Sequence, residues 1–221
     1  MKIFIPIKEI SQRVPGKNFR DFGGNPLWLH AVNKFRELGE VFIDTDSDKL
    51  LEEANRIDNV MAYSRVPTLR GHDVSVNRLI KHWLDSFIND ENETLVQLHV
   101  TNPFLKAETI DRFQEAFEEC KIDTYCGANI IQARGWRLEA TGDGCLRSIP
   151  LNHNPNVLEE TQSLQEIIVE NSTFYMFTKR SFNKLSNRMG ANPHFGKVEF
   201  PENIDIDTEE DWKLAIKLLK D

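Results

Sequence analysis

The chain has 221 residues, of which 40% are hydrophobic, and its formal net charge is -8 at pH 7. This length allows one sizeable core and predicts a single domain over residues 1–221. The acidic balance disfavours a nucleic-acid binder, and no apolar run is long enough to span a bilayer. The opening residues lack a signal-peptide pattern, and three cysteines without tight spacing argue against a disulfide framework or a zinc site. We therefore expect a cytoplasmic protein without a membrane partner.

Strand and helix patterns alternate through the first half of the chain. Expected strands are residues 2–7, 40–44, 60–63 and 94–100, and expected helices begin at Pro26, Ser47, Ser75 and Glu108. This rhythm predicts parallel strands with right-handed crossovers, hence a mostly parallel, three-layer, Rossmann-like α/β sheet. Such sheets bind ligands at the carboxyl ends of their strands. The loops after Ile7, Asp44, Tyr63 and Val100 are therefore the candidate site.

The rhythm changes after Thr124. Residues 125–132, 136–140 and 145–149 are predicted to be strands, with residues 141–144 as a hairpin turn. We expect this part to form a β extension beside the parallel core. The remaining expected elements are strands at 171–177 and 197–200 and helices at 179–185 and 208–219, the last with an acidic first turn.

The segment after the first strand is basic within an acidic protein. Against the single Glu9 it carries four cations, Lys8, Arg13, Lys17 and Arg20. A triphosphate site needs cations, a hydroxyl and backbone N–H groups in one concave loop, and Ser11 and Gly16 could supply the last two. The glycines of the P-loop and of the dinucleotide fingerprint are missing. From charge alone, a solvated basic loop explains the segment equally well.

Two acids near the other end of the chain alternate with apolar residues. Asp205 and Asp207 are two positions apart, so in an extended segment their carboxylates point to the same side. Paired carboxylate oxygens suit Mg²⁺, with phosphate oxygens and waters completing its shell. An acidic helix start explains residues 209–211 but not Asp205 between Ile204 and Ile206. We therefore expect a magnesium site here.

Residues 5–18, Ile-Pro-Ile-Lys-x-x-Ser-x-Arg-Val-Pro-Gly-Lys-Asn, resemble the opening motif of the sugar-acid cytidylyltransferases. This family includes the CMP-sialic acid and CMP-KDO synthetases. Residues 205–211, Asp-Ile-Asp-Thr-Glu-Glu-Asp, resemble its late motif, whose first two aspartates hold the metal. Weaker matches lie at residues 42–47, where a helix N-cap explains Ser47 as well, and at 64–75, 99–104 and 160–175. The last resembles the sialic-type Arg-Thr-Gln-Asp-Leu-Pro and Glu-Asn-Gly-x-x-Tyr motifs.

The resemblance implies transfer of CMP from CTP to the anomeric hydroxyl of a sialic-acid-like (nonulosonic) sugar acid, with release of pyrophosphate and with Mg²⁺ as cofactor. It assigns nucleotide binding to Lys8, Ser11, Arg13, Lys17, Asn18, Arg65 and Ser75. It assigns sugar-acid binding to His99, Thr101, Asn102 and Gln162, and metal binding to Asp205 and Asp207. The expected catalytic residues are Lys17, Arg13 and Asp207. It also implies a homodimer, in which the extension at about residues 133–165 completes the neighbour's sugar site.

Four positions depart from the family pattern. Lys8 stands at an arginine, Gln12 at the sialic-type lysine, His99 at a glutamine and Glu160 at an arginine. Three alternatives therefore stay open: a CMP-KDO-type enzyme, another sugar nucleotidyltransferase of the same fold, and a catalytically idle nucleotide-binding homologue. Sialic, legionaminic, pseudaminic and KDO-type acids all remain possible substrates.

Overall fold

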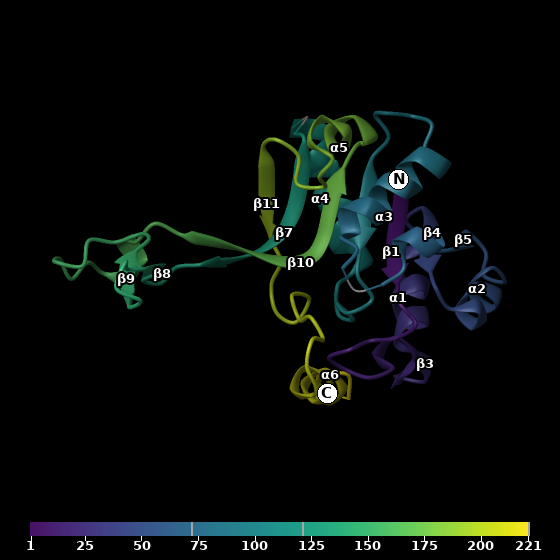
Figure 1. Ribbon diagram of the computed structural model, residues 1–221, viewed down its shortest axis with the longest axis horizontal. Helices are drawn as coiled ribbons and strands as arrows, with labels where there is room; N and C mark the ends of the chain where they lie inside the picture. Colours follow the sequence, from purple (N-terminus) through teal and green to yellow (C-terminus); the bar gives the residue numbers. More distant parts are fainter. Residues whose placement is uncertain (72, 121, 221) are drawn as a thin grey trace.

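The computed structural model describes residues 1–71, 73–120 and 122–220. Among these residues, a seven-stranded sheet of order β11-β7-β10-β6-β1-β4-β5 forms the centre of the molecule (Figure 1). Its strands are β1 Lys2–Ile7, β4 Glu40–Thr45, β5 Val60–Ser64, β6 Leu95–Leu98, β7 Thr124–Ile131, β10 Ile167–Phe177 and β11 Pro193–Lys197. Only β10 runs antiparallel to its neighbours. The mostly parallel α/β fold predicted from the sequence is thus confirmed.

Helices cover both faces of this sheet and make it a three-layer structure. One face carries α1 Leu27–Phe35, α2 Asp48–Ala54 and α4 Ala107–Cys120, and the other carries α3 Val76–Phe87 and α5 Lys179–Leu185. The alternation of side chains along β1 serves both cores. Ile3, Ile5 and Ile7 pack with α1 and α4, whereas Phe4 stacks on Trp83 of α3 with ring centroids 4.9 Å apart. Because β1 packs into a core on each face of the sheet, the position of its carboxyl end, where the site forms, is well defined.

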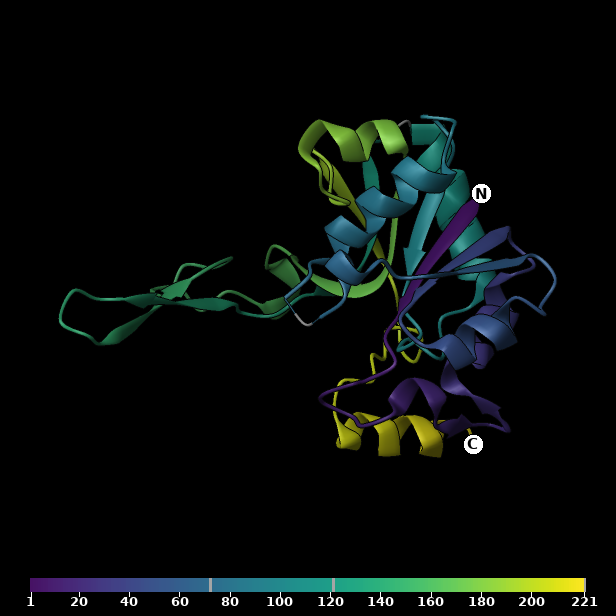
Figure 2. The ribbon, with the colours of Figure 1, turned by 45° about the vertical axis from the view of Figure 1, so that its right-hand side comes forward.

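The C-terminal helix α6, Glu209–Leu218, returns to the start of the chain. Trp212 and Ala215 on α6 pack against Phe22 and Leu27, which belong to the short hairpin of β2 Asp21–Phe22 and β3 Asn25–Pro26 and to α1. A capping box between Thr208 and Asp211 begins the helix. This packing brings the segment just before α6 beside the basic loop that follows β1 (Figure 2).

An arm projects far from the sheet (Figures 1 and 2). It consists of the antiparallel hairpin β8 Trp136–Ala140 and β9 Leu146–Pro150, followed by a 3-10 turn, η3 Thr161–Ser163. Large apolar side chains are exposed on it, among them Leu138 at 67% and Leu158 at 92%. The hairpin lies where the sequence predicts the β extension. None of the helices in the described part of the chain has the length and hydropathy of a membrane-spanning segment.

The late edge strand lies earlier in the chain than predicted. It was expected at residues 197–200, whereas β11 occupies Pro193–Lys197 and pairs with β7 at the edge of the sheet. Gly196 allows this pairing under α4, because a Cβ there would lie 2.1 Å from the Phe113 ring. Beyond residue 198 the chain turns, with the Asn203 N–H donating to the Glu199 carbonyl at 3.2 Å. Among the other strands, the largest differences are that β10 begins at Ile167 and that β6 ends at Leu98.

Candidate active site

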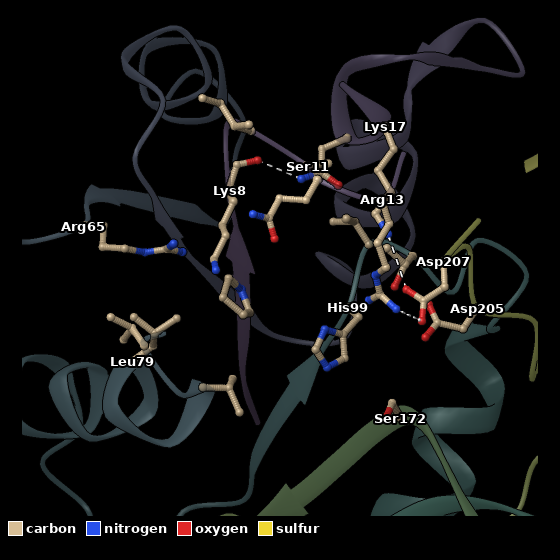
Figure 3. Close-up of a pocket in the computed structure, with 18 of the residues that line it drawn as sticks. Lys8, Ser11, Arg13, Lys17, Arg65, Leu79, His99, Ser172, Asp205 and Asp207 are labelled. Atoms are coloured by element: carbon tan, nitrogen blue, oxygen red, sulfur yellow. Dashed lines mark hydrogen bonds and ion pairs between the residues drawn. The ribbon is translucent and has the colours of Figure 1, made fainter. Parts of the chain in front are cut away.

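A cavity of about 540 Å³ opens at the carboxyl ends of the parallel strands (Figure 3). The loop after β1, Arg65 after β5 and residues 99–101 after β6 line it, together with Ser172 of β10 and the segment before α6. The strand-end rule predicted this edge of the sheet. Of the predicted site residues, ten line the cavity: Lys8, Ser11, Arg13, Lys17, Asn18, Arg65, His99, Thr101, Asp205 and Asp207.

The basic loop is folded into a defined shape by its own residues. Buried Val14 anchors it, and Gly16, with φ 65°, turns it into the 3-10 helix η1 Lys17–Phe19. The Asn18 amide donates to the Lys8 carbonyl at 2.8 Å and closes the loop on itself. The Lys8 ammonium donates to the Gly71 carbonyl at 3.1 Å. The loop is therefore a structured cationic wall and differs from a solvated basic turn.

Lys17 connects the basic loop to the acidic pair. Its buried ammonium donates to the Ile206 carbonyl and lies 3.7 Å from the Asp207 carboxylate. Burial lowers the pKa of Lys17, and the carboxylates of Asp207 and Asp205 oppose that shift. Arg13 adds a second, more exposed cation, whose Nη1 donates to Asp207 at 2.7 Å. Arg13 and Asp207 are 194 residues apart in the sequence, so two distant segments share one charge cluster (Figure 3).

The acidic pair has the donor set of a hard-cation site. Both aspartates line the cavity, and Asp205 Oδ1 is buried without a hydrogen-bond partner among the described residues. Burial raises the pKa of Asp205, and the nearby Thr101 hydroxyl opposes the shift. The structure describes no cluster of three or more His, Cys, Asp or Glu side chains around a metal position. Two carboxylates with an unsatisfied oxygen fit Mg²⁺ if phosphate oxygens and waters fill the rest of its shell.

Arg65 reaches the opposite side of the cavity from a buried position after β5. Its guanidinium forms an ion pair with Asp44 of β4, and both side chains are 0% exposed. Nη2 also donates to the Asp44 carbonyl at 3.1 Å, while Nη1 is buried and has no partner among the described residues. Burial raises the pKa of Asp44, and Arg65 opposes this shift. Asp44 therefore holds Arg65 in place while leaving one of its donors for a ligand.

His99 sits at the end of β6, between the two ends of the cavity. Its Nε2 lies 2.9 Å from the amide nitrogen of Gln97. Burial, together with the smaller effect of the nearby cations Arg188 and Lys17, lowers the pKa of His99 to about 3. The imidazole is therefore neutral at pH 7, and it can take part in hydrogen bonding but adds no positive charge.

Three predicted residues do not line the cavity in the described chain. Ser75 is an exposed N-cap of α3, although its neighbours Val74 and Val76 do line the cavity. Asn102 is buried, and its amide donates to the Ile204 carbonyl at 3.1 Å, so it fixes the acidic segment instead. Gln162 is exposed in η3 on the arm.

Other cavity residues were not predicted. Apolar wall residues include Ile10, Val74, Val76 and Leu79, and the polar additions are Gln12, Ser172 and Arg188. Ser172 has φ 57°, a left-handed conformation that favours glycine. Ser172 occupies the glycine position of the sialic-type Glu-Asn-Gly-x-x-Tyr motif. That match could have indicated a left-handed backbone near the site from the sequence alone. Arg188 lies in the turn after α5, where no sequence pattern pointed to a site.

Known proteins share both the sequence pattern and the fold. A CMP-N,N'-diacetyllegionaminic acid synthase from Legionella pneumophila subsp. pneumophila is 26% identical, over 98% of this chain and 94% of that protein. A pseudaminic acid cytidylyltransferase from Campylobacter jejuni subsp. jejuni is 22% identical over the same shares, 98% and 94%. The solved structure of a CMP:2-keto-3-deoxy-manno-octonic acid synthetase complexed with CTP has the same fold, with a TM-score of 0.67 at 16% identity, and covers 99% of this chain and 97% of that one.

A family model also matches nearly the whole chain. The model described as cytidylyltransferase matches residues 3–220, which run from β1 through α6. It therefore includes the basic loop, Arg65, the end of β6 and the acidic pair. The chain belongs to the cytidylyltransferase family.

Proposed function

We propose that this chain transfers CMP from CTP to the anomeric hydroxyl of a sialic-acid-like nonulosonic acid and releases pyrophosphate. One observation carries the proposal: a single cavity contains the cationic loop after β1 and the carboxylate pair before α6. The names of the relatives, which specify diacetyllegionaminic and pseudaminic acids, support the nonulosonic class.

In this proposal the loop after β1 binds the triphosphate. Lys8, Ser11, Arg13 and Lys17 line the cavity and supply three cations and a hydroxyl. Because Lys17 is held by the Ile206 carbonyl, its charge is already oriented before a nucleotide arrives. Catalysis of phosphoryl transfer rests mostly on such positioning and charge neutralisation. Lys17 and Arg13 would thus stabilise the charge that develops on the phosphates.

The cytidine would lie toward Arg65. Arg65 Nη1 and Asn18 Oδ1 are both buried without partners among the described residues, one a donor and the other an acceptor. A cytosine ring offers both an exocyclic amino donor and ring acceptors, so it could satisfy both atoms. Val74 and Leu79 provide an apolar wall on this side. Buried polar groups without partners are costly, so binding a base that satisfies them discriminates against bases that do not.

Asp205 and Asp207 would hold Mg²⁺, the cofactor that we propose. When bound there, the ion would neutralise phosphate charge and improve pyrophosphate as a leaving group. Arg13 and Lys17 hold the Asp207 carboxylate in place in the described chain, because they form ion pairs with it at 2.7 and 3.7 Å. The carboxylate is therefore already positioned beside Asp205 at the proposed metal site.

The arm suits a homodimer, which is also part of the proposal. Its exposed apolar side chains form the kind of surface that a partner usually covers. Gln162, predicted to bind the sugar acid, lies on the arm and not at its own chain's cavity. A second copy could therefore bring Gln162 to the neighbouring site. Light scattering would measure a mass of two chains if this is correct and of one chain if it is wrong.

The cytoplasmic location remains a prediction from the sequence.

Pyrophosphate release tests the proposed reaction. Each of CTP, UTP, GTP and ATP would be paired with sialic, diacetyllegionaminic, pseudaminic and KDO acids, in the presence of Mg²⁺. We expect CTP and a nonulosonic acid to give the highest kcat/KM. Equal rates with all four nucleotides would contradict the assignment to CTP, and a preference for KDO would favour the KDO-type alternative. No release with any acid would favour the idle homologue.

A further inference from the structure

Arg188 is a cation of the cavity that the proposed nucleotide site does not use. It lies in the turn after α5, half-buried, and lines the cavity beside the end of β6. Its guanidinium lies 3.5 Å from the centre of the Tyr175 ring, and its Nη1 donates to Gln97 Oε1. Stacking fixes the plane of the guanidinium and leaves N–H groups along its edge for a planar anion. The position of this side chain is therefore well determined by β6 and β10.

The sheet order separates Arg188 from the proposed base site. Arg65 follows β5, the phosphate loop follows β1, and Arg188 packs on side chains of β6 and β10. Neighbouring strands are about 4.8 Å apart, so the three spacings from β5 to β6 amount to about 14 Å. A nucleotide with its base at Arg65 and its phosphates at the loop leaves the β6 and β10 side for the other substrate.

Arg188 also differs from the other arginines of the cavity in its partners. Arg13 is paired with Asp207, and Arg65 is paired with Asp44. Within the described ranges, no carboxylate lies within ion-pair distance of Arg188, and the nearby Glu170 instead accepts from the Tyr175 hydroxyl. Burial lowers the pKa of Arg188, which means that its charge is partly desolvated. A bound anion would offset this desolvation.

The backbone beside this end of the cavity is unusual. A register shift in β10 between Glu170 and Tyr175 places Ser172 in the cavity wall. Its φ of 57° is left-handed, which costs a non-glycine residue on the order of 1 kcal/mol. Ser172 Oγ lies 3.2 Å from the Tyr175 hydroxyl oxygen and can donate to it, since the Tyr175 proton is directed at Glu170. A polar side chain kept in a strained position at a cavity wall indicates a ligand with polar groups on this side.

We propose that Arg188 binds the carboxylate of the sugar acid and thereby selects acids over neutral sugars. The inference rests on the proposed function and deepens it, since it names the group that recognises the acceptor. The contact is a charge-assisted hydrogen bond, and Ser172 lies on the same side for a neighbouring polar group of the sugar. Arg188 is thus a specificity-determining residue, separate from those that hold the triphosphate.

The test compares each sugar acid with its carboxamide. Wild-type enzyme, Arg188→Met and Arg188→Lys would be assayed by pyrophosphate release with the preferred acid and with its carboxamide. We expect the wild type to favour the acid strongly. Arg188→Met should raise the KM for the acid about 10- to 100-fold, reduce the preference for the acid by a similar factor, and leave the KM for CTP within about twofold. Arg188→Lys should retain part of the preference.

Arg112→Met is the matched control. Arg112 also stacks on an aromatic ring, with its guanidinium 5.0 Å from the centre of Phe113, but it does not line the cavity. This variant should have wild-type kinetics.

An unchanged preference for the acid in Arg188→Met overturns the inference while the proposed function stands. A rise in the KM for CTP equal to the rise for the acid also overturns it. If Arg188→Met does not fold, the wild type and Arg188→Lys decide: a wild type that accepts the carboxamide as readily as the acid, or a lysine variant with full preference and unchanged KM, contradicts a guanidinium–carboxylate contact. A wild type that turns over no sugar acid defeats the proposed function, and this inference with it.

Discussion

Removing Asp44 should destabilise the protein strongly, because it would leave a buried charge unpaired. The Asp44 and Arg65 side chains are both 0% exposed, and Arg65 Nη1 already lacks a partner among the described residues. Breaking a buried ion pair from one side costs about 3–5 kcal/mol, since the remaining ion keeps its desolvation cost. In a chain of this size 1 kcal/mol shifts Tm by about 2–4 °C, so Asp44→Ala should lower Tm by about 6–20 °C.

Urea unfolding followed by tryptophan fluorescence measures this loss. Asp85→Ala is the control, because Lys81 and Asp85 form an exposed helix-surface pair at 2.5 Å whose removal should cost less than about 0.5 kcal/mol. The double variant Asp44→Leu/Arg65→Met should lose less stability than the sum of its single changes. An Asp44→Ala loss below about 1 kcal/mol would refute the reasoning. It would mean that water from the cavity solvates Arg65 without Asp44.

Three further predictions concern the cavity. Asp207→Asn should lower kcat more than about 100-fold, because it removes a proposed metal ligand. The free energy of unfolding should change by less than about 1 kcal/mol, because the Asp207 side chain is 37% exposed and its ion pairs are partly solvated. Pyrophosphate release and urea unfolding would measure the two effects, and a nearly unchanged kcat would contradict the metal-binding role of Asp207. Chelation of divalent cations should abolish turnover and added Mg²⁺ should restore it; full activity in a chelator would rule out the metal.

The third of these predictions concerns pH. The folded-state pKa of His99, about 3, lies below its ordinary 6.5, so the unfolded chain binds more protons between these values and stability falls as pH drops below 6.5. At pH 5 the loss is about 2 kcal/mol. His99→Gln should remove this part of the pH dependence, measured by urea unfolding at pH 7.5 and pH 5; an identical dependence in both proteins would contradict it.

The periodicity of apolar residues predicted the central sheet well, because the strands and helices that form the cores on its two faces carry apolar residues at regular spacing. The alternation in β1 and the one-sided pattern of α3 are local properties that packing then satisfies. The shifted edge strand β11 shows where this fails. Its position depends on Gly196 passing under Phe113, a contact between residues far apart in the sequence.

The candidate site was predictable where residue type and strand end coincide. The basic loop follows this rule and lines the cavity. Asp205, predicted from its place between two apolar residues, lines it as well. Asn102 also follows a strand end, that of β6, but its amide turns toward the Ile204 carbonyl. No local sequence pattern determines that direction. Arg188 could not be predicted, because the packing of the turn after α5 against Tyr175 brings it to the cavity. Loops carry function in ways that periodicity does not encode.

Oxygen labelling tests the central claim most directly. The preferred sugar acid, carrying heavy oxygen at its anomeric hydroxyl, would be incubated with CTP and Mg²⁺, and the products would be analysed by mass spectrometry. If the cavity brings that hydroxyl to the α-phosphate, the CMP-sugar retains the heavy oxygen and the pyrophosphate carries none. A CMP-sugar without the label, a sugar phosphate with CDP, or no cytidine product at all would contradict the account.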